Sequence, residues 1–314
     1  MKVLIIGATG FIGRPLFQRL LERGHEVYVF TRNYERARKV LQGGAHFVQW
    51  SSDEYIVLQE YAHKVDAVIN LAGEQLSSGR WTLERKHKIL SSRVNIGKAI
   101  SFALDRSQDK PYLLIQGSAI GFYGFSPNHT FREGMPVGKG FLPMVTMQWE
   151  ESVRHVDDYN TRKVFIRTGL VLGKEGGMLP VMMLPFRFFA GGYPGSGNQW
   201  VSWIHIDDQV RAIIDLLESE NASGVYNLTS PNPVRMRDFA KILGKVMGRP
   251  CWTRMPGFLL KAFLGDMARE TILSGQRVLP RRLDDHHFRF EHPDLEEALT
   301  DILQSGDDQK SSSS

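Results

Sequence analysis

The sequence predicts an α/β fold: a doubly wound parallel sheet with a smaller C-terminal α/β lobe. Three observations predict it. Residues 1–6 form a short apolar run that is typical of a buried strand, and glycines follow at positions 7, 10 and 13. An amphipathic segment over 15–23 and a second apolar run over 26–31 come next. Because strands and helices then keep alternating, we expect parallel strands with helices on both faces of the sheet.

The glycine spacing is that of a Rossmann-type dinucleotide turn. We expect Gly7 to make the tight turn, Gly10 to let backbone amides approach a pyrophosphate, and Gly13 to let the helix pack on the strand. The helix N-terminus adds unpaired N–H groups and the positive end of the helix dipole. The same turn contains three further predicted cofactor contacts, Thr9, Phe11 and Ile12.

Later segments extend the same pattern. Further strands are predicted over 45–49, 66–73, 111–118 and 163–168, and helices over 82–105 and 138–158. In open parallel sheets, ligands bind beyond the carboxyl ends of the strands. The loops that follow predicted strands should therefore meet at one edge of the sheet; they are 7–13, 31–33, 71–74 and 117–124.

The second part of the chain is less regular. Residues 173–197 are rich in glycine and apolar residues, with a short helix expected over 181–189. A strand over 224–228 and helices ending at 218, 247, 269 and 303 follow. We expect a dinucleotide-binding domain over 1–172, with 202–230 contributing, and a substrate lobe over 173–201 and 231–305. Residues 306–314 end in four serines and are expected to be a disordered tail.

Composition excludes several classes of protein. Of 314 residues, 42% are hydrophobic, and no apolar run approaches the ~20 residues of a membrane span. The single cysteine, Cys251, excludes an internal disulfide and fits a reducing compartment, so we expect a cytoplasmic protein. The net charge of +5 comes without a helix-turn-helix or aromatic-interleaved pattern. We therefore expect no nucleic acid and no membrane as partner, and a monomer or homodimer.

Thr31 and Arg32 stand at the end of the second predicted strand. NAD-binding proteins carry a carboxylate there, which binds the ribose 2′-hydroxyl. Here a hydroxyl and a guanidinium take its place, and an arginine suits the 2′-phosphate of NADP. We therefore expect NADP(H) as the cofactor. The alternative is a solvated arginine in a surface turn.

Five more short motifs follow the glycine turn in order: NLAGE over 70–74, SAIGFYG over 118–124, WE at 149–150, RTGLVLG over 167–173 and WIHID over 203–207. Together with 275–280 and 288–299, they resemble an atypical subfamily of the extended short-chain dehydrogenase/reductases. This subfamily is often labelled nucleoside-diphosphate-sugar epimerase-like and has a C-terminal domain of unknown function. The resemblance covers about residues 1–303.

The resemblance implies an NADP-binding Rossmann-like domain and further cofactor contacts. By matching motif, Leu71, Ala72 and Gly73 are expected on the adenosine side and Val171 near the nicotinamide end. Lys88 and Arg93, on the predicted helix over 82–105, are expected to contact the cofactor as well. For these two cations an exposed basic helix face is the alternative.

The expected catalytic pair is missing. Extended members use a tyrosine four residues before a lysine, with a nearby serine, and Ser118 stands where that serine is expected. Ser118 is therefore a predicted catalytic residue and cofactor contact. If Glu150 is the glutamate that commonly follows the lysine by four residues, the tyrosine and lysine positions hold Leu142 and Thr146. Neither side chain can do the work of that pair.

Tyr123 is the best substitute acid/base, because it follows Ser118 by five residues in the same loop. General acid–base help is typically worth 10²–10⁴-fold, so such a hydroxyl would matter. The alternative is an aromatic side chain that packs on the cofactor. Tyr159 and Lys163 have the required spacing but lie too late in the chain, and we interpret them as a chance match.

Four other features have two interpretations each. His205 lies beside Asp207, where a structural role is favoured over catalysis. His286 and His287 follow two aspartates, but no metal site is expected there. The glycine-rich run 191–197 is either a substrate-site loop or a phosphate cradle. A set of flexible and aromatic side chains either lines an apolar cleft or packs a core: Met178, Met182, Met183, Phe186, Phe188 and Phe189.

We therefore expect an NADP(H)-dependent oxidoreductase or epimerase-like enzyme that acts on a small-molecule substrate. The alternative is an NADP(H)-binding regulatory or redox-sensing protein without turnover, since plastid and cyanobacterial proteins that resemble this family have been called cell-division factors. A sugar-nucleotide epimerase proper would need a proton shuttle that the sequence does not provide.

Overall fold

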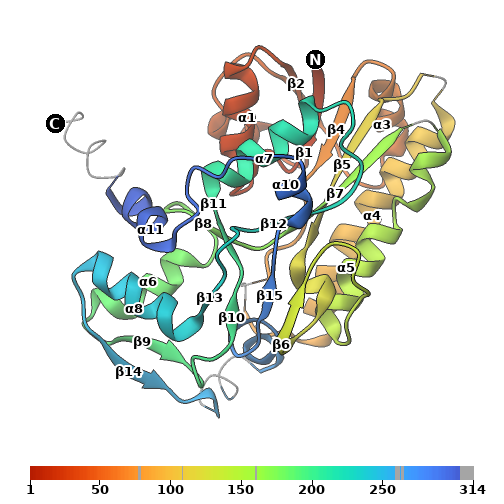
Figure 1. Ribbon diagram of the computed structural model, residues 1–314. Coiled ribbons are helices and arrows are strands. Elements are labelled where there is room, and N and C mark those ends of the chain that lie inside the picture. The colour runs from red at the N-terminus through yellow and green to blue at the C-terminus, as the bar shows by residue number, and fades with distance from the viewer. Residues whose placement is uncertain (77–78, 108, 160, 259–261, 263–264, 305–314) are drawn as a thin grey trace.

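The computed structural model describes all residues except 77–78, 108, 160, 259–261, 263–264 and 305–314 (Figure 1). At its centre lies a seven-stranded sheet in which every pairing is parallel. Its strands are β1 (Lys2–Ile6), β2 (Glu26–Thr31), β3 (His46–Gln49), β4 (Ala67–Asn70), β5 (Leu113–Ala119), β7 (Arg162–Thr168) and β12 (Gly224–Leu228). They follow the order β12-β7-β5-β4-β1-β2-β3. The predicted Rossmann-type doubly wound sheet is confirmed.

Helices cover both faces of this sheet. Successive side chains of β1 point to opposite faces, so each face packs against helices in an apolar layer of its own. Val3 and Ile5 pack with α1 (Gly13–Glu22) and α7 (Ile206–Glu218). Leu4 and Ile6 belong to the opposite layer, with α3 (Tyr55–Ala62) and α4 (Leu83–Arg106). In Figure 1 these two pairs of helices flank the sheet. A central strand that is buried on both faces explains why residues 1–6 read as one continuous apolar run.

The second lobe is built from short sheets and helices, of which three among the described residues pack together (Figure 1). The pairs are β8 (Leu170–Leu172) with β11 (Trp203–His205), β9 (Gly191–Pro194) with β14 (Cys251–Met255), and β10 (Trp200–Val201) with β13 (Val234–Arg235). The helices are α6 (Leu179–Arg187), α8 (Met236–Met247) and α11 (Leu295–Gln304). They share a third apolar core that includes Leu179, Phe239 and Leu299.

Some predicted elements differ in the structure. The helix expected over 138–158 is α5 (Phe141–Glu151) followed by a 3₁₀ turn, η2 (Arg154–Tyr159). Gly140, with φ 128°, precedes α5, and the Ser152 hydroxyl at its end donates to the Trp149 carbonyl, which competes with helix continuation. A strand that periodicity did not predict, β6 (Ser126–Phe131), pairs with β15 (Gln276–Val278).

Four short elements were not predicted from the sequence. They are α2 (Tyr34–Val40), the 3₁₀ turn η1 (Ile120–Tyr123), α10 (Arg281–Asp285) and the π-turn η3 (Ala268–Ile272). Much of the helix expected over 257–269 lies outside the described residues, as does the predicted tail over 306–314. The division into a dinucleotide-binding domain and a substrate lobe stays a prediction.

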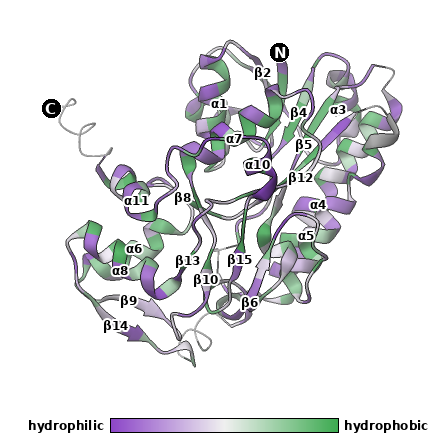
Figure 2. Cartoon of the chain, in the orientation of Figure 1, coloured by the Kyte–Doolittle hydropathy of each residue, from purple (hydrophilic) through white to green (hydrophobic). Residues whose placement is uncertain are grey.

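Hydropathy follows this architecture. Figure 2 shows hydrophobic residues concentrated along the central strands, with hydrophilic and hydrophobic residues alternating along the surface helices. Among the described helices, none has both the length and the apolar composition that crossing a bilayer requires.

Candidate functional site

A cleft of about 1000 Å³ opens at the carboxyl ends of the central strands and extends into the second lobe. Its sheet side is made by the residues that end or follow β1, β4, β5 and β7, as expected for an open parallel sheet. Among the predicted site residues, it is lined by Gly7, Gly10, Phe11, Ile12, Gly13, Leu71, Gly73 and Ser118. The structure therefore brings the glycine turn and Ser118 to one cavity.

The glycine turn has the backbone geometry that the spacing predicts. Gly7 has φ 95°, and a Cβ there would lie 2.9 Å from the Ala72 nitrogen. A Cβ on Gly13 would lie 2.2 Å from the Gly7 carbonyl oxygen, so the first turn of α1 can sit this close to β1 only without a side chain. The Gly10 N–H donates to the Gly7 carbonyl at 3.0 Å. The result is a bare backbone cradle at a helix N-terminus, which fits a pyrophosphate.

Phe11 links the two halves of the cleft. Its ring packs under the loop that follows β8, where a Cβ on Gly176 would lie 2.7 Å from the ring. Gly173 and Gly177 approach the same ring. Glycines in this loop are therefore explained by close contact with the aromatic side chain at the tip of the turn.

Other predicted cofactor residues surround the cradle. β1 lies between β2 and β4, so Thr31 and Arg32 at the end of β2 share the edge with the glycine turn. Arg32 is exposed, and the Thr31 hydroxyl is engaged with the backbone of Asn33. Ala72 donates its N–H to Asn70 Oδ1 at 3.2 Å. Arg14 Nε donates a hydrogen bond to the Thr9 carbonyl oxygen at 3.1 Å.

Lys88 and Arg93 lie on α4 but in different surroundings. Lys88 is exposed. Arg93 turns inward against Gly73, whose added Cβ would lie 2.9 Å from its Cζ, and its guanidinium lies 5.0 Å from the centre of the Trp149 ring. Burial lowers the pKa of Arg93 to about 10, because the charged form loses hydration. Its Nη1 donates to the Ile89 carbonyl at 2.9 Å, and the nearby Glu74 carboxylate favours the charged form, so the buried charge is partly compensated.

Val171 was expected near the nicotinamide end of the cofactor, but its side chain does not line the cleft. It lies in β8, paired with Ile204 of β11, and its side chain packs in the apolar core. The neighbouring Leu170 lines the cleft instead. Because alternate residues of a strand face opposite sides, a motif position in β8 can miss the cavity by one residue.

Ser118 ends β5 in the cleft and is held by a buried ion pair. Its hydroxyl donates to Glu150 Oε1 at 2.6 Å. Arg167 of β7 donates to both oxygens of Glu150, from Nε and Nη2, at 2.8 Å each. This bidentate geometry is the strong form of the interaction. Sequence reasoning singled out Glu150 only as a position marker, and it missed Arg167, which a sequence pattern alone does not connect to a glutamate 17 residues away.

Tyr123 does not lie in the cleft. Only 2% of its surface is exposed, and its hydroxyl donates to Asn227 Oδ1 at 2.7 Å and accepts from Arg167 at 3.1 Å. Its ring stacks on Phe131, and burial raises the pKa of its hydroxyl. This geometry supports neither an acid role nor packing on a cofactor. The hydroxyl instead completes the hydrogen bonding of a buried arginine.

The two positions that the spacing to Glu150 predicts for the family's tyrosine and lysine have structural surroundings. Leu142 and Thr146 face η1 from α5, and the Thr146 hydroxyl donates to the Leu142 carbonyl at 2.9 Å. Lys163 donates to the Arg154 carbonyl at 2.7 Å, on β7. Leu142, Thr146 and Lys163 do not line the cleft.

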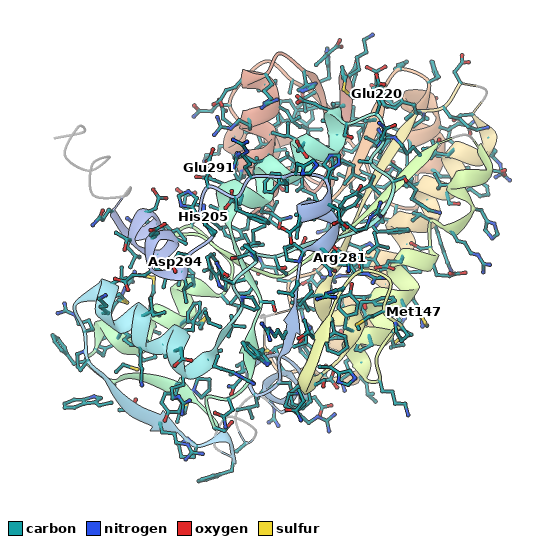
Figure 3. All side chains as sticks on the ribbon, in the orientation of Figure 1. Met147, His205, Glu220, Arg281, Glu291 and Asp294 are labelled. Carbon is teal, nitrogen blue, oxygen red and sulfur yellow. The ribbon has the colours of Figure 1, made fainter. Side chains whose placement is uncertain are left out.

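The histidines have partners that sequence order did not reveal. His205 is the N-cap of α7, and its Nδ1 accepts from the Asp207 N–H at 3.1 Å. Its Nε2 lies 3.3 Å from Asp301, and its ring stacks on His292 with ring centres 3.9 Å apart. Figure 3 shows His205 near Glu291 and Asp294, at the junction of the lobes. His286 instead pairs with Asp215 at 3.2 Å.

The glycine-rich run 191–197 and the methionine-rich segment divide between cleft and core. Gly192, Tyr193 and Pro194 of β9 line the cleft, and a Cβ on Gly192 would meet the Thr253 carbonyl at 2.0 Å. These glycines therefore allow β9 and β14 to pack closely, and the run forms part of the cleft wall. Met178, Met182 and Phe186 also line the cleft, Met183 is buried in the core, and Phe188 and Phe189 are exposed.

Comparisons with known proteins agree with this geometry. Residues 3–229 match the NAD dependent epimerase/dehydratase family, and residues 255–302 match a domain of unknown function, DUF1731. The chain is 40% identical to the epimerase family protein YfhF of Bacillus subtilis, over 96% of this chain and 98% of that protein. It is 39% identical to the chloroplastic epimerase family protein SDR39U1 homolog of Arabidopsis thaliana, over 97% and 87%.

Among the solved structures that match along nearly the whole chain is one of a relative more than 30% identical. It is the crystal structure of human epimerase family protein SDR39U1 (isoform 2) with NADPH, with a TM-score of 0.87 and 31% identity, covering 97% of this chain and 99% of that chain. The fold is thus shared with this relative along nearly the whole chain. The chain belongs to the NAD dependent epimerase/dehydratase family.

Proposed function

We propose that this protein binds NADP(H) in the glycine cradle and uses it in an oxidoreductase or epimerase-like reaction on a small molecule held by the second lobe. One observation carries the proposal: the cradle, Ser118 and the lobe open into a single cleft. A binding protein without a substrate would not require the lobe side of that cavity.

The preference for NADP(H) rests on charge. Arg32 lies exposed beside the turn, with no acidic residue at the end of β2 to bind a ribose hydroxyl. Arg93 adds a second guanidinium near Gly73. The human relative was crystallised with NADPH, which supports the same cofactor here.

Bound NADPH supplies a hydride. The chain would supply the cradle amides to hold the pyrophosphate, and the Ser118 hydroxyl near the end of β5 to donate a hydrogen bond to a substrate oxygen. The Ser118 hydroxyl already donates a hydrogen bond to Glu150, so it can donate one to a substrate only when that 2.6 Å bond is given up. Glu150, held by Arg167, thus positions the hydroxyl and competes with the substrate for its hydrogen bond.

A second function follows if Glu150 is the glutamate of the family's motif, because Leu142 and Thr146 then occupy the positions of its proton shuttle. They support an NADP(H)-binding regulatory or redox-sensing protein without turnover. A cytoplasmic location, supported by the single cysteine, and a monomer or homodimer remain parts of the proposal.

A melting assay with NADPH and NADH tests the binding step. A ligand present at 100 times its Kd stabilises the fold by about 2.7 kcal/mol, which is readily measured. We expect a large shift with NADPH and a smaller one with NADH; no shift with either would contradict the proposal. Oxidation of NADPH by a panel of carbonyl compounds then separates an enzyme from a protein that only binds.

A further inference from the structure

The lobe side of the cleft is apolar on every wall. Its side chains come from the segment before α6, from α6 itself, from β9, from α8, and from the strand and turn that follow α8. They are Met178, Pro180, Val181, Met182, Pro185, Phe186, Tyr193, Pro194, Met236, Phe239, Leu243, Met255, Met267 and Ile272. Hydroxyl groups supply most of the polarity there, from Tyr193, Thr253 and Thr271.

Charge is almost missing from the same walls. Within the part of the chain that the structure describes, no lysine, arginine or histidine lines the cleft. The one carboxylate is Glu175, which is exposed at the rim. A diphosphate against the lobe walls, away from the backbone amides of the glycine turn, would lose its hydration without gaining a cation, and it would face a like charge. The walls therefore disfavour a sugar nucleotide.

The cavity is wider than the glycine cradle alone. Ligand pockets usually measure about 300–1000 Å³, and this cleft, at about 1000 Å³, reaches the upper end of that range. The glycine cradle and Ser118 occupy its sheet side, whereas the apolar walls enclose the remainder. Flexible methionines on these walls suit a ligand of irregular shape.

We propose that the lobe side of the cleft binds an uncharged, largely apolar small molecule, next to the cofactor end of the cavity. This rests on the proposed function for the cradle, since a substrate has to lie beside the cofactor. Burial of the ligand's apolar surface supplies the affinity, at about 25 cal/mol per Å². The hydroxyls of the cleft orient its polar group.

Two exposed residues on α6 provide a matched pair of variants. Val181 is 57% exposed and lines the cleft, whereas Leu184 is 51% exposed and lies outside it. Because both side chains already face water in part, Val181→Lys and Leu184→Lys should both fold. Met255→Lys tests the opposite wall, on β14, where the side chain is 44% exposed.

The experiment measures binding of Nile red, an uncharged apolar dye, to the full chain with NADPH present. We expect saturable binding that Val181→Lys and Met255→Lys weaken about tenfold or more, and that Leu184→Lys changes by less than about twofold. UDP-glucose should not displace the dye.

Three results would overturn the inference: no saturable binding, equal effects of Val181→Lys and Leu184→Lys, or displacement by UDP-glucose. The melting shift with NADPH is recorded for all four proteins. If the unmodified chain shows the melting shift with NADPH but does not bind Nile red, only the apolar substrate site is refuted. If the unmodified chain shows no melting shift with NADPH, the proposed function itself is refuted.

Discussion

Glu150 and Arg167 form a bidentate ion pair beneath the cleft, with side chains 13% and 6% exposed. Ser118 of β5 donates to the same carboxylate, so one pair connects α5, β5 and β7. A pair buried to this extent has lost its hydration and depends on both partners being present.

Glu150→Ala should therefore destabilise the fold by about 3–5 kcal/mol, because Arg167 would remain buried without its carboxylate. Urea unfolding measures the change. The neighbouring Glu151 pairs with Arg154 at the surface, where both side chains are more than half exposed. Glu151→Ala should cost less than about 1 kcal/mol, and equal losses for the two variants would contradict a special role for Glu150.

Tyr123→Phe should reduce stability by about 1–3 kcal/mol, since it leaves the buried Asn227 Oδ1 without its donor. NADPH binding should stay within about twofold of the unmodified protein, because the hydroxyl lies outside the cleft. If Tyr123→Phe abolished turnover while stability and NADPH affinity were unchanged, the hydroxyl would have to reach the substrate after all.

Gly13→Ala should abolish NADPH binding and lower stability, since the new Cβ would lie 2.2 Å from the Gly7 carbonyl oxygen. The control is Gly44→Ala, where nothing lies within 4 Å of the added Cβ. We expect the control to alter stability by less than about 1 kcal/mol. A melting scan with and without NADPH reads out both effects, and normal binding by Gly13→Ala would show that α1 can move away from the turn.

Arg32→Asp should weaken NADPH binding by about tenfold or more and leave NADH binding equal or tighter. The charge reversal Arg38→Asp, on the exposed end of α2, serves as the control for a general change in net charge. Titrations with both cofactors measure the ratio of the two Kd values. An unchanged ratio in Arg32→Asp would assign cofactor choice to another residue.

Acid should weaken the fold through His205. Burial, together with the neighbouring His292, lowers the pKa of His205 below its usual 6.5. The unfolded chain therefore binds a proton first, and stability falls as the pH drops through 6.5 toward the folded-state pKa. His205→Asn keeps an N-cap but does not titrate, so its unfolding free energy should change less across this range. The exposed His129→Asn should behave like the unmodified chain.

Local features of the candidate site could be predicted because they depend on short-range geometry. Gly7, Gly10 and Gly13 reveal themselves by spacing, since only a residue without Cβ permits that turn and that helix contact. The missing carboxylate near Thr31 and Arg32 is equally local. The surroundings of Arg93 were not predictable. The periodicity of the sequence places Arg93 on α4, but it does not determine whether the guanidinium contacts Gly73 or solvent.

By itself, therefore, the sequence determined the alternation of strands and helices and the glycine turn after the first strand. Tertiary structure alone decided that the Tyr123 hydroxyl donates a hydrogen bond to Asn227, 104 residues away. It likewise decided that Ser118 and Arg167 both donate to the carboxylate of Glu150. It also decided that α6, β9 and β14 enclose an apolar cavity. Periodicity encodes which face of an element is buried, but partners distant in sequence are chosen only when the whole sheet is assembled.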